Sequence, residues 1–328
     1  MKKLLISILI FSFINTVKAH PGIGIVKDSR GNIFYTDLKQ VWRISANGGK
    51  IVAVPHVHSH ELFIDANDNL YGEHLWYNGE KLDTWGHYVW RLHPNGKLDT
   101  VIGPDAGFLE NYSFVRDVSG NMYWAERFKI SKIKKKTPEG KIETIAEGKF
   151  KDIRWMYATA AGIVYFIDLT DLYKIEPGKP ARMIAEGINS NTSLFGPITA
   201  SRHDLMGIWT DKEDNIYVAN FGGQVVKKIG VDGTVTKIVF SAAPWSPTGG
   251  VFDAQGNLWL LEYSATNDAR VRKIPADELG KQHNTGLTQL KNNIFPPVLL
   301  IGFGIFSVML IVMGARVVRK KAIMVSGE

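Results

Sequence analysis

Six copies of one motif, placed in order along most of the chain, predict an all-β six-bladed propeller with four-stranded blades. Each copy has a polar turn, then a short apolar strand with an aromatic second residue, then an outer strand with a basic residue. The copies begin 37, 52, 42, 52 and 42 residues apart, close to the roughly forty residues of a propeller blade. Apolar segments at the two ends of the chain add an N-terminal signal peptide and a C-terminal transmembrane helix to this prediction.

The turns are rich in Asn, Asp and Gly, which tolerate the left-handed backbone that tight hairpins need. The six turn motifs are Asp28–Asn32, Asp65–Asn69, Asp117–Asn121, Thr159–Ile163, Asp211–Asn215 and Asp253–Asn257. The aromatic residues of the strands that follow are Phe34, Tyr71, Tyr123, Tyr165, Tyr217 and Trp259. Only the fourth turn lacks its Asp, so the repeat predicts six blades.

Composition excludes several classes of protein. Hydrophobic residues make up 45% and charged residues 22% of the 328 residues, which is typical of a chain with a packed core. The absence of Cys excludes disulfides, thiolate zinc sites, cysteine nucleophiles and covalently attached haem. Residues 1–19 and 316–328 each carry a net charge of +3 out of the total of +7, so the rest is close to neutral. A nucleic-acid partner is therefore not expected.

The two ends predict a single-pass protein of the inner membrane. Residues 1–19 are predicted to be a signal peptide, because lysines are followed by an apolar stretch at Leu4–Phe13 and by small residues up to Ala19. The apolar stretch is shorter than the ~20 residues of an uncleaved membrane span. Residues 294–315 contain no charge and are long enough to cross a membrane, although a buried helix is the alternative. The basic tail 316–328 places its side in the cytoplasm, so the propeller faces the periplasm or the exterior. The predicted domains are 1–19 signal peptide, 20–277 propeller, 278–293 stalk, 294–315 transmembrane helix and 316–328 cytoplasmic tail.

Strand direction predicts where a ligand would bind. In each blade the entrance to the first strand and the exit of the second lie on one face, so their loops surround the mouth of the central channel. The exit positions hold polar residues after otherwise apolar strands, namely Asp37, His74, Glu126, Asp168, Asn220 and Glu262. The entrance loops add Glu61, Glu110, Asn111, Asp152, Arg154 and Asp204 to the predicted ligand pocket. The alternative is that these short polar side chains only cap the strands by bonding to loop backbone.

A cluster of histidines in the second blade predicts a metal site at this mouth. His58 and His60 alternate along a strand and therefore project to one side, and His74 lies at the adjoining exit. With the carboxylates Glu126, Asp168 and Glu262 they form the predicted ligand set for a divalent ion, which is Ca, Mg, Zn or Mn. Glu61 or Glu73 would then serve as a proton-transfer partner.

The second blade also carries an aromatic insertion, Leu75–Tyr88, in its exit loop. Trp76 and Trp85 are assigned to the ligand pocket with Tyr77 and Tyr88, because aromatic rings at a pocket mouth stack on sugar rings or apolar ligands. Packing over a neighbouring blade is the alternative.

The blades resemble those of the NHL-repeat and SMP-30/gluconolactonase-like six-bladed propellers, whose units read Asp-x-x-Gly-Asn-aliphatic-aromatic-x-x-Asp, as Asp28–Asp37 does. The resemblance covers about residues 22–275 and implies the fold, since the group includes lactonases, lyases, receptors and binding scaffolds. Its metal-dependent enzymes have a Glu ahead of the first inner strand, where this chain has His20 and Pro21. Their entrance Asp stands about five residues before the turn Asp, whereas Asp204 stands seven before Asp211.

Two functions follow from these features. The first is a membrane-anchored module that binds a small molecule or a protein partner through the channel mouth. The second is a metal-dependent, lactonase-like hydrolase or lyase of a small lactone or carbohydrate-derived substrate. The sequence also predicts a weak seam between the first and last blades, because no spare strand precedes Ile23 and the sixth blade lacks a fourth strand unless Thr285–Leu290 supplies it.

Overall fold

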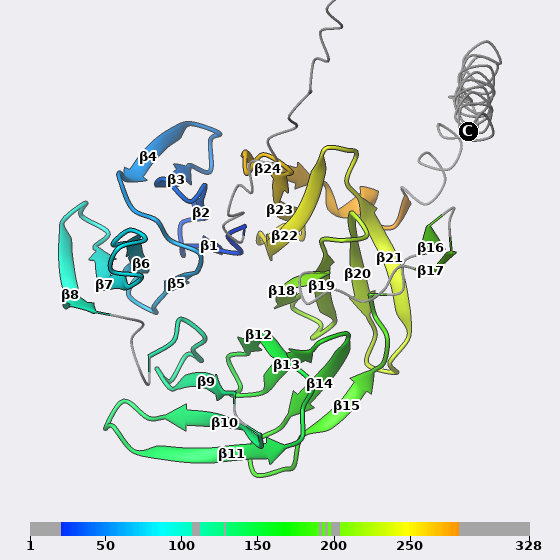
Figure 1. Ribbon diagram of the computed structural model, residues 1–328. Helices are drawn as coiled ribbons and strands as arrows, with labels where there is room; N and C mark the ends of the chain where they lie inside the picture. Colours follow the sequence, from blue (N-terminus) through cyan, green and yellow to red (C-terminus); the bar gives the residue numbers. More distant parts are fainter. Residues whose placement is uncertain are drawn as a thin grey trace, which may run out of the picture. The chain divides into compact units, whose positions relative to one another are not determined.

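The computed structural model describes residues 21–106, 112–127, 129–189, 192–193, 196–197 and 204–281. All of them belong to the first of the two units into which the chain divides, Met1–Lys281 and Gln282–Glu328. They form six antiparallel sheets arranged in a ring (Figure 1), which confirms the predicted six-bladed propeller. The predicted signal peptide, transmembrane helix and cytoplasmic tail lie outside the described residues, among which no helix is long and apolar enough to span a membrane.

In every blade the strands follow one another in sequence order from the centre outwards, each antiparallel to the next. The first blade contains β1 (Ile25–Lys27), β2 (Ile33–Thr36), β3 (Val41–Ile44) and β4 (Lys50–Val54). The second blade contains β5 (Leu62–Ile64), β6 (Leu70–Tyr77), β7 (Trp85–Leu92) and β8 (Leu98–Ala106). The third blade contains β9 (Met122–Glu126), β10 (Ser131–Lys136) and β11 (Ile142–Gly148). The inner position of the third blade is held by a single bridge between Arg116 and Met122.

The second half of the ring repeats this arrangement. The fourth blade contains β12 (Ile153–Ala158), β13 (Val164–Asp168), β14 (Asp171–Ile175) and β15 (Arg182–Ala185). The fifth blade contains β18 (Leu205–Thr210), β19 (Ile216–Asn220), β20 (Val225–Ile229) and β21 (Val235–Phe240). The sixth blade contains β22 (Trp245–Phe252), β23 (Leu258–Ser264) and β24 (Ala269–Ile274). A small strand pair, β16 (Thr192–Ser193) and β17 (Gly196–Pro197), stands apart, and a short helix, η1 (Ala276–Glu278), follows the last strand. The sixth blade has three strands within the described chain, and Thr285–Leu290 lies beyond it.

The repeated Asp ties each turn to the strand that follows it. Asp211 accepts hydrogen bonds on Oδ1 from the backbone N–H groups of Glu213 and Asn215, at 3.0 and 2.9 Å. Its Oδ2 accepts from the Asn215 side chain at 2.8 Å and from the Tyr217 hydroxyl at 2.7 Å. The aromatic residues Tyr71, Tyr123 and Trp259 donate to their own turn Asp in the same way. The motif is therefore structural, because a carboxylate bonded on both oxygens fixes the turn and the strand together.

Buried apolar clusters join five of the six pairs of neighbouring blades. The seam between the first and sixth blades is among them, with Tyr35 packed beside Tyr263. The Tyr263 hydroxyl also donates to the Thr36 carbonyl at 2.8 Å, and Lys27 Nζ donates to the Phe252 carbonyl at 2.8 Å. The prediction of a weak seam here is wrong, because within the described residues a buried apolar cluster and two hydrogen bonds already join the first and sixth blades.

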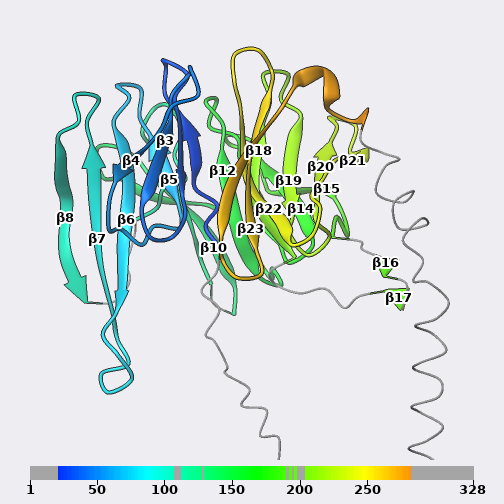
Figure 2. The ribbon, with the colours of Figure 1, turned by 90° about the horizontal axis from the view of Figure 1, so that it is seen from above.

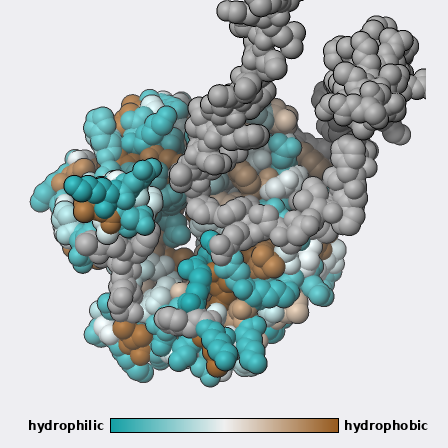
Figure 3. All heavy atoms as spheres, viewed as in Figure 1, coloured by the Kyte–Doolittle hydropathy of each residue, from teal (hydrophilic) through white to brown (hydrophobic). Residues whose placement is uncertain are grey.

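The junction between the second and third blades is built differently. No buried apolar cluster spans it within the described ranges, and the Arg116 guanidinium instead lies over the rings of Phe63, Tyr71 and Tyr112, at 5.3, 5.9 and 5.1 Å from their centroids. The hairpin of β6 and β7 rises beyond the rest of this blade (Figure 2). Hydrophilic residues predominate at the outer edges of the face in Figure 3, as solvated outer strands require.

Candidate functional site

Three of the six exit residues hold the backbone of their own blade. Asp37 accepts on Oδ1 from the N–H groups of Lys39 and Gln40, both at 2.9 Å, and on Oδ2 from Trp42 Nε1 at 2.7 Å. Asp168 accepts from the N–H of Asp152 at 2.6 Å, and Asn220 accepts from the N–H of Gly223 at 3.0 Å. These contacts agree with the alternative prediction, in which the polar exit residues cap the strands by bonding to loop backbone.

The other two exit carboxylates are paired with cations. Glu262 is completely buried, and its oxygens accept from Arg270 Nε at 2.7 Å, Arg272 Nη2 at 3.0 Å and Ser241 Oγ at 2.5 Å. Glu126 lies 3.7 Å from Lys134 Nζ. A carboxylate already neutralised by arginine or lysine has little reason to bind a metal ion.

The predicted metal site does not form from its six ligands. Each of the six already has another partner, and nowhere in the described part of the chain are three or more His, Asp or Glu side chains placed to hold a metal ion; the six are His58, His60, His74, Glu126, Asp168 and Glu262. These six residues therefore do not form one metal-binding group in the described part of the chain.

The remaining predicted pocket residues also have local roles. Arg154 Nε donates to Asp152 Oδ2 at 2.8 Å, and Asn189 Nδ2 donates to Asp204 Oδ2 at 3.1 Å. Trp76 and Trp85 belong to the long hairpin of β6 and β7, which replaces the predicted exit loop. Glu110 and Asn111 lie outside the described residues.

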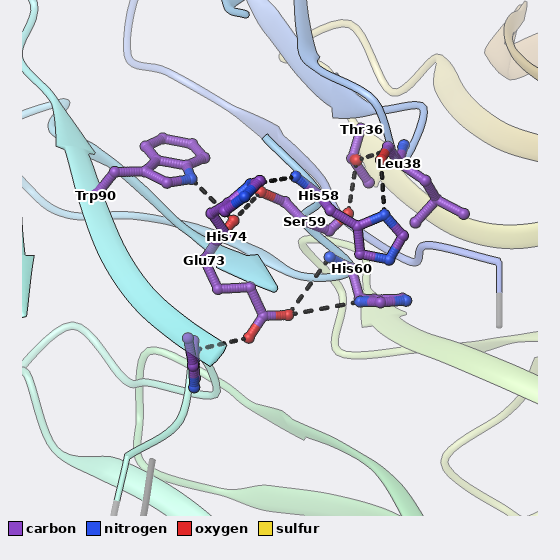
Figure 4. Close-up of polar contacts among 9 residues, drawn as sticks. Thr36, Leu38, His58, Ser59, His60, Glu73, His74 and Trp90 are labelled. Carbon is purple, nitrogen blue, oxygen red and sulfur yellow. Dashed lines mark hydrogen bonds and ion pairs between the residues drawn. The ribbon is translucent and has the colours of Figure 1, made fainter. Parts of the chain in front are cut away.

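In the second blade the three predicted histidines do lie close together (Figure 4). The backbone N–H of His58 donates to His74 Nδ1 at 3.0 Å, and His58 Nδ1 donates to the Leu38 carbonyl of the first blade at 2.8 Å. The rings of His58 and His60 meet edge to face at 4.7 Å between centroids. Burial lowers the pKa of His74, and burial together with the nearby His60 lowers the pKa of His58. Both rings are therefore neutral at pH 7 and bind backbone groups.

Glu73 is the centre of the polar contacts in this blade. Its carboxylate lies 3.7 Å from His60 Nδ1 on one side and 3.3 Å from His87 Nε2 on the other. Its backbone carbonyl accepts from Trp90 Nε1 at 2.9 Å and from the Ser59 hydroxyl. Burial alone would raise the pKa of Glu73, but the two imidazoles outweigh it and lower the pKa to about 2. Glu73 is therefore ionised throughout the physiological range.

Glu61 has the opposite electrostatic environment. Burial and the negative charge of Glu73 raise its pKa to about 7, against the lowering influence of His60 and Arg127. Among the described residues its carboxyl makes no hydrogen bond or ion pair, and burial is the main reason that its pKa is raised. It is thus a carboxyl that changes charge near neutral pH.

The register of the blade explains why these two carboxyls meet. Leu62 of β5 pairs with Gly72 of β6, so the next residues, Glu61 and Glu73, stand opposite each other at the end of the ladder. Side chains alternate along strands, so both lie on the face that carries Phe63 and Tyr71, against which Arg116 of the third blade packs. Gly72, which precedes Glu73, cannot carry a side chain, because a Cβ there would lie 2.1 Å from the Trp90 ring.

Sequence reasoning gave the histidines the leading role and made Glu61 and Glu73 their assistants. In the structure the two glutamates are at the centre, because His60 and His87 lower the pKa of Glu73, and burial together with the charge of Glu73 raises the pKa of Glu61. His87 is the residue whose role was missed, since the insertion was expected to be a loop. The alternation of Glu73, Leu75 and Tyr77 opposite Trp85, His87 and Val89 was the available signal for a hairpin.

The fold and the site together define a six-bladed propeller with two opposed carboxyls of different pKa in its second blade. No family model and no curated relative matches the chain. A gluconolactonase from Xanthomonas campestris is 10% identical with a TM-score of 0.53, over 78% of this chain and 87% of that one. An auxiliary nutrient binding protein from Bacteroides ovatus is 11% identical with a TM-score of 0.52, over 78% and 69%.

A third solved structure, a protein of unknown function from Bacteroides thetaiotaomicron, is 16% identical with a TM-score of 0.50, over 78% of this chain and 70% of that one. At these identities the chains share the fold alone. The resemblance to the gluconolactonase-like six-bladed propellers is thereby confirmed at the level of the fold.

Proposed function

We propose that the chain is a hydrolase of a small lactone or a related carbohydrate-derived ester, acting through Glu61 at the channel end of the second blade. The observation that carries this proposal is the pair of opposed carboxyls with separated pKa values, about 7 for Glu61 and about 2 for Glu73. Two carboxyls whose environments push their pKa values apart are the usual mark of an acid–base site.

Glu61 would transfer the proton in both halves of the reaction. As a carboxylate it accepts a proton from water while the water oxygen bonds to the lactone carbonyl carbon. It then returns that proton to the ring oxygen as the carbon–oxygen bond of the lactone breaks, so the product is the open hydroxy acid. Glu73 stays ionised and keeps the pKa of Glu61 near the operating pH.

Arg127 supplies positive charge that acts on Glu61. Its Nε donates to the Ile153 carbonyl at 2.6 Å, which anchors the side chain between the third and fourth blades. Its charge also lowers the pKa of Glu61, which shows that the two groups influence each other. We assign it the stabilisation of negative charge that develops on the carbonyl oxygen of the substrate.

The test measures hydrolysis of five- and six-membered aldonolactones by the full-length protein in detergent, with Glu61→Gln as the variant. Glu126→Gln is the matched control, because Glu126 occupies an exit position but is paired with Lys134. Turnover by the parent protein and the control, with loss in Glu61→Gln, supports the assignment. Hydrolysis that Glu61→Gln leaves unchanged contradicts it.

A binding module without turnover is the second candidate. The gluconolactonase and the nutrient binding protein share this fold and have different roles, so the fold alone does not choose between them. Lactones that bind with measurable heat but are never hydrolysed would favour this second function.

We further propose that the propeller is anchored in the inner membrane by residues 294–315 and faces the periplasm or the exterior. The uncharged stretch and the basic residues that follow it support this topology. Protease added to intact spheroplasts should digest residues 20–293 and spare an epitope placed after Lys321. The reverse pattern would contradict the topology.

A further inference from the structure

The turns of the third and fourth blades lack the contact that joins the turns of the first two blades. In that first pair, Ser29 donates to the Asp68 carboxylate through its backbone N–H at 2.8 Å and through its hydroxyl at 2.6 Å. The corresponding positions of the third and fourth turns hold Val118 and Gly162, which cannot form this contact. The degenerate fourth turn therefore presents no side chain to its neighbour at Gly162.

A cavity of about 670 Å³ lies between these two turns. It is lined on one side by the third-blade turn with parts of β10 and β11, and on the other by the fourth-blade turn and residues 175–180, which connect β14 to β15. Its volume falls within the roughly 300–1,000 Å³ of pockets that bind small organic molecules. The turns lie at the opposite end of the strands from the channel mouth, so the cavity is separate from the site of Glu61.

The position of Gly162 has room for a side chain. A Cβ there would lie 3.5 Å from Asp117 Oδ2 and 3.7 Å from the Tyr123 hydroxyl, which are ordinary contacts. Its φ of +74° resembles the 59° and 60° of Asp68 and Asp214, which hold the same turn position in the second and fifth blades. A short polar residue is therefore compatible with this turn, and the fourth blade has none there.

The third blade gives one wall of the cavity an excess of positive charge. From Arg127 to Lys151 the chain has nine Lys or Arg residues and three Glu, a net charge of +6. Lys135 lies on the cavity side of β10, because it pairs with Tyr123, which packs against the fourth blade. Within the described chain its ammonium makes one ion pair, with Glu143 at 3.5 Å, which is longer than the roughly 2.7–3.2 Å of a hydrogen bond. An ammonium has three donors, so Lys135 keeps the capacity to bind a further acceptor.

The acidic residues of this wall are already neutralised or used. Glu143 lies 3.5 Å from Lys135 and 3.6 Å from Lys141, so two cations share one carboxylate. Asp117 accepts hydrogen bonds from its own turn on both oxygens and from the Tyr123 hydroxyl at 2.8 Å. Neither carboxylate therefore cancels the positive charge of the blade.

The facing wall has the same balance of charge. Glu176 lies 2.7 Å from Lys174 Nζ and is also paired with Lys179 and Arg182. Hydrogen bonds from Lys174 and Lys179 lower the pKa of Glu176 to about 2. Three cations thus surround one carboxylate, and both walls favour a negatively charged ligand.

We propose that this cavity is a second ligand site, for a small organic anion that carries a carboxylate or a phosphate group. Lys135 would donate to the anionic group, and the side chains of Ile145 and Ile175 would contact the carbon skeleton. The inference is independent of the proposed function, because none of its residues belongs to the Glu61 site.

The test measures binding of citrate and of glucose 6-phosphate to the full-length protein in detergent by calorimetry, with glucose as the neutral counterpart. At least one of the two anions should bind, and glucose should not. Lys135→Met should weaken the binding about tenfold or more, as expected for the loss of one hydrogen bond from a charged donor. Lys228→Met is the matched control and should leave binding unchanged, because Lys228 holds the same place opposite Tyr217 in the fifth blade.

Gly162→Asp and Gly162→Asn give a second matched pair, because their side chains have nearly the same size and differ in charge. Gly162→Asp should weaken binding of the anion about tenfold more than Gly162→Asn, since only Asp adds negative charge to the cavity. If neither anion binds, or if Lys228→Met weakens binding as much as Lys135→Met, the site is wrong. Equal affinities in the two Gly162 variants, or binding of glucose as tight as that of glucose 6-phosphate, would contradict an anionic ligand.

Discussion

The second and sixth blades each contain a glutamate of the predicted ligand site, and the two glutamates have opposite environments. Glu262 of the sixth blade is fully buried and bonded to Ser241, Arg270 and Arg272. Glu61 of the second blade has no hydrogen bond or ion pair within the described residues and lies opposite the charged Glu73. Removing a buried carboxylate that is paired with two arginines leaves those charges uncompensated, whereas a buried carboxyl that faces another carboxylate has its pKa raised toward neutrality.

The largest effect expected from this contrast is on catalysis. Glu61→Gln should reduce lactone turnover by about 10²- to 10⁴-fold, because the amide cannot carry the proton between water and the leaving oxygen. Stopped-flow or pH-stat rates of the full-length protein measure this. A loss confined to KM would show that Glu61 only binds the substrate.

Glu262→Gln should instead reduce stability, by about 2–4 kcal/mol, because it leaves two arginines without their carboxylate. The value falls below that of a fully buried pair, since Arg270 is 37% and Arg272 28% exposed. Urea unfolding followed by tryptophan fluorescence measures it, with Glu126→Gln as a control expected to change stability by less than about 0.5 kcal/mol. Equal losses in the two variants would contradict a special role for the buried pair.

The two blades also differ in how far the sequence predicted them. The six repeats, the turn motifs and the aromatic strands were readable, because Asp211 and Tyr217 bond within one repeat, at a fixed spacing. The partners of Glu262 come from Ser241 and from β24, and those of Glu73 come from residues before β5 and from β7. Such contacts depend on strand register and on the β6–β7 hairpin, which the sequence had predicted to be a loop.

The free energy of unfolding should fall as the pH rises through the titration of Glu61. This is opposite to the usual behaviour of a carboxyl group, whose pKa is lowered on folding. Its pKa is about 7 in the folded protein and near the ordinary 4.5 when unfolded, so the folded state holds the extra proton between these values. Its stabilising contribution is complete below pH 4.5 and is lost as the pH rises through 7. Melting temperatures at pH 5, 7 and 9 should show that Glu61→Gln removes this loss. Parallel curves for the two proteins would exclude the raised pKa.

Glu73→Gln should move the pKa of Glu61 downwards, because it removes the neighbouring negative charge that helps to raise it. The carboxyl stretch in difference infrared titration reports the protonation of Glu61 directly, without any substrate. The pH–rate profile of lactone hydrolysis should shift to lower pH with it. An unchanged titration would mean that burial alone sets the pKa and that the two carboxyls do not act as a pair.

Ser241→Ala should have a smaller effect on the stability of the sixth blade than Glu262→Gln. The Ser241 hydroxyl donates to the same oxygen of Glu262 that accepts from Arg272, so Glu262 keeps both arginines when the hydroxyl is removed. The loss should therefore be about 1 kcal/mol, the net value of one hydrogen bond, and well below that of Glu262→Gln. A double-mutant cycle of the two changes isolates the coupling between the hydroxyl and the carboxylate. If Ser241→Ala costs as much as Glu262→Gln, the hydroxyl and not the arginines holds the buried charge, and the contrast between Glu262 and Glu61 would have to be explained by hydrogen bonding alone.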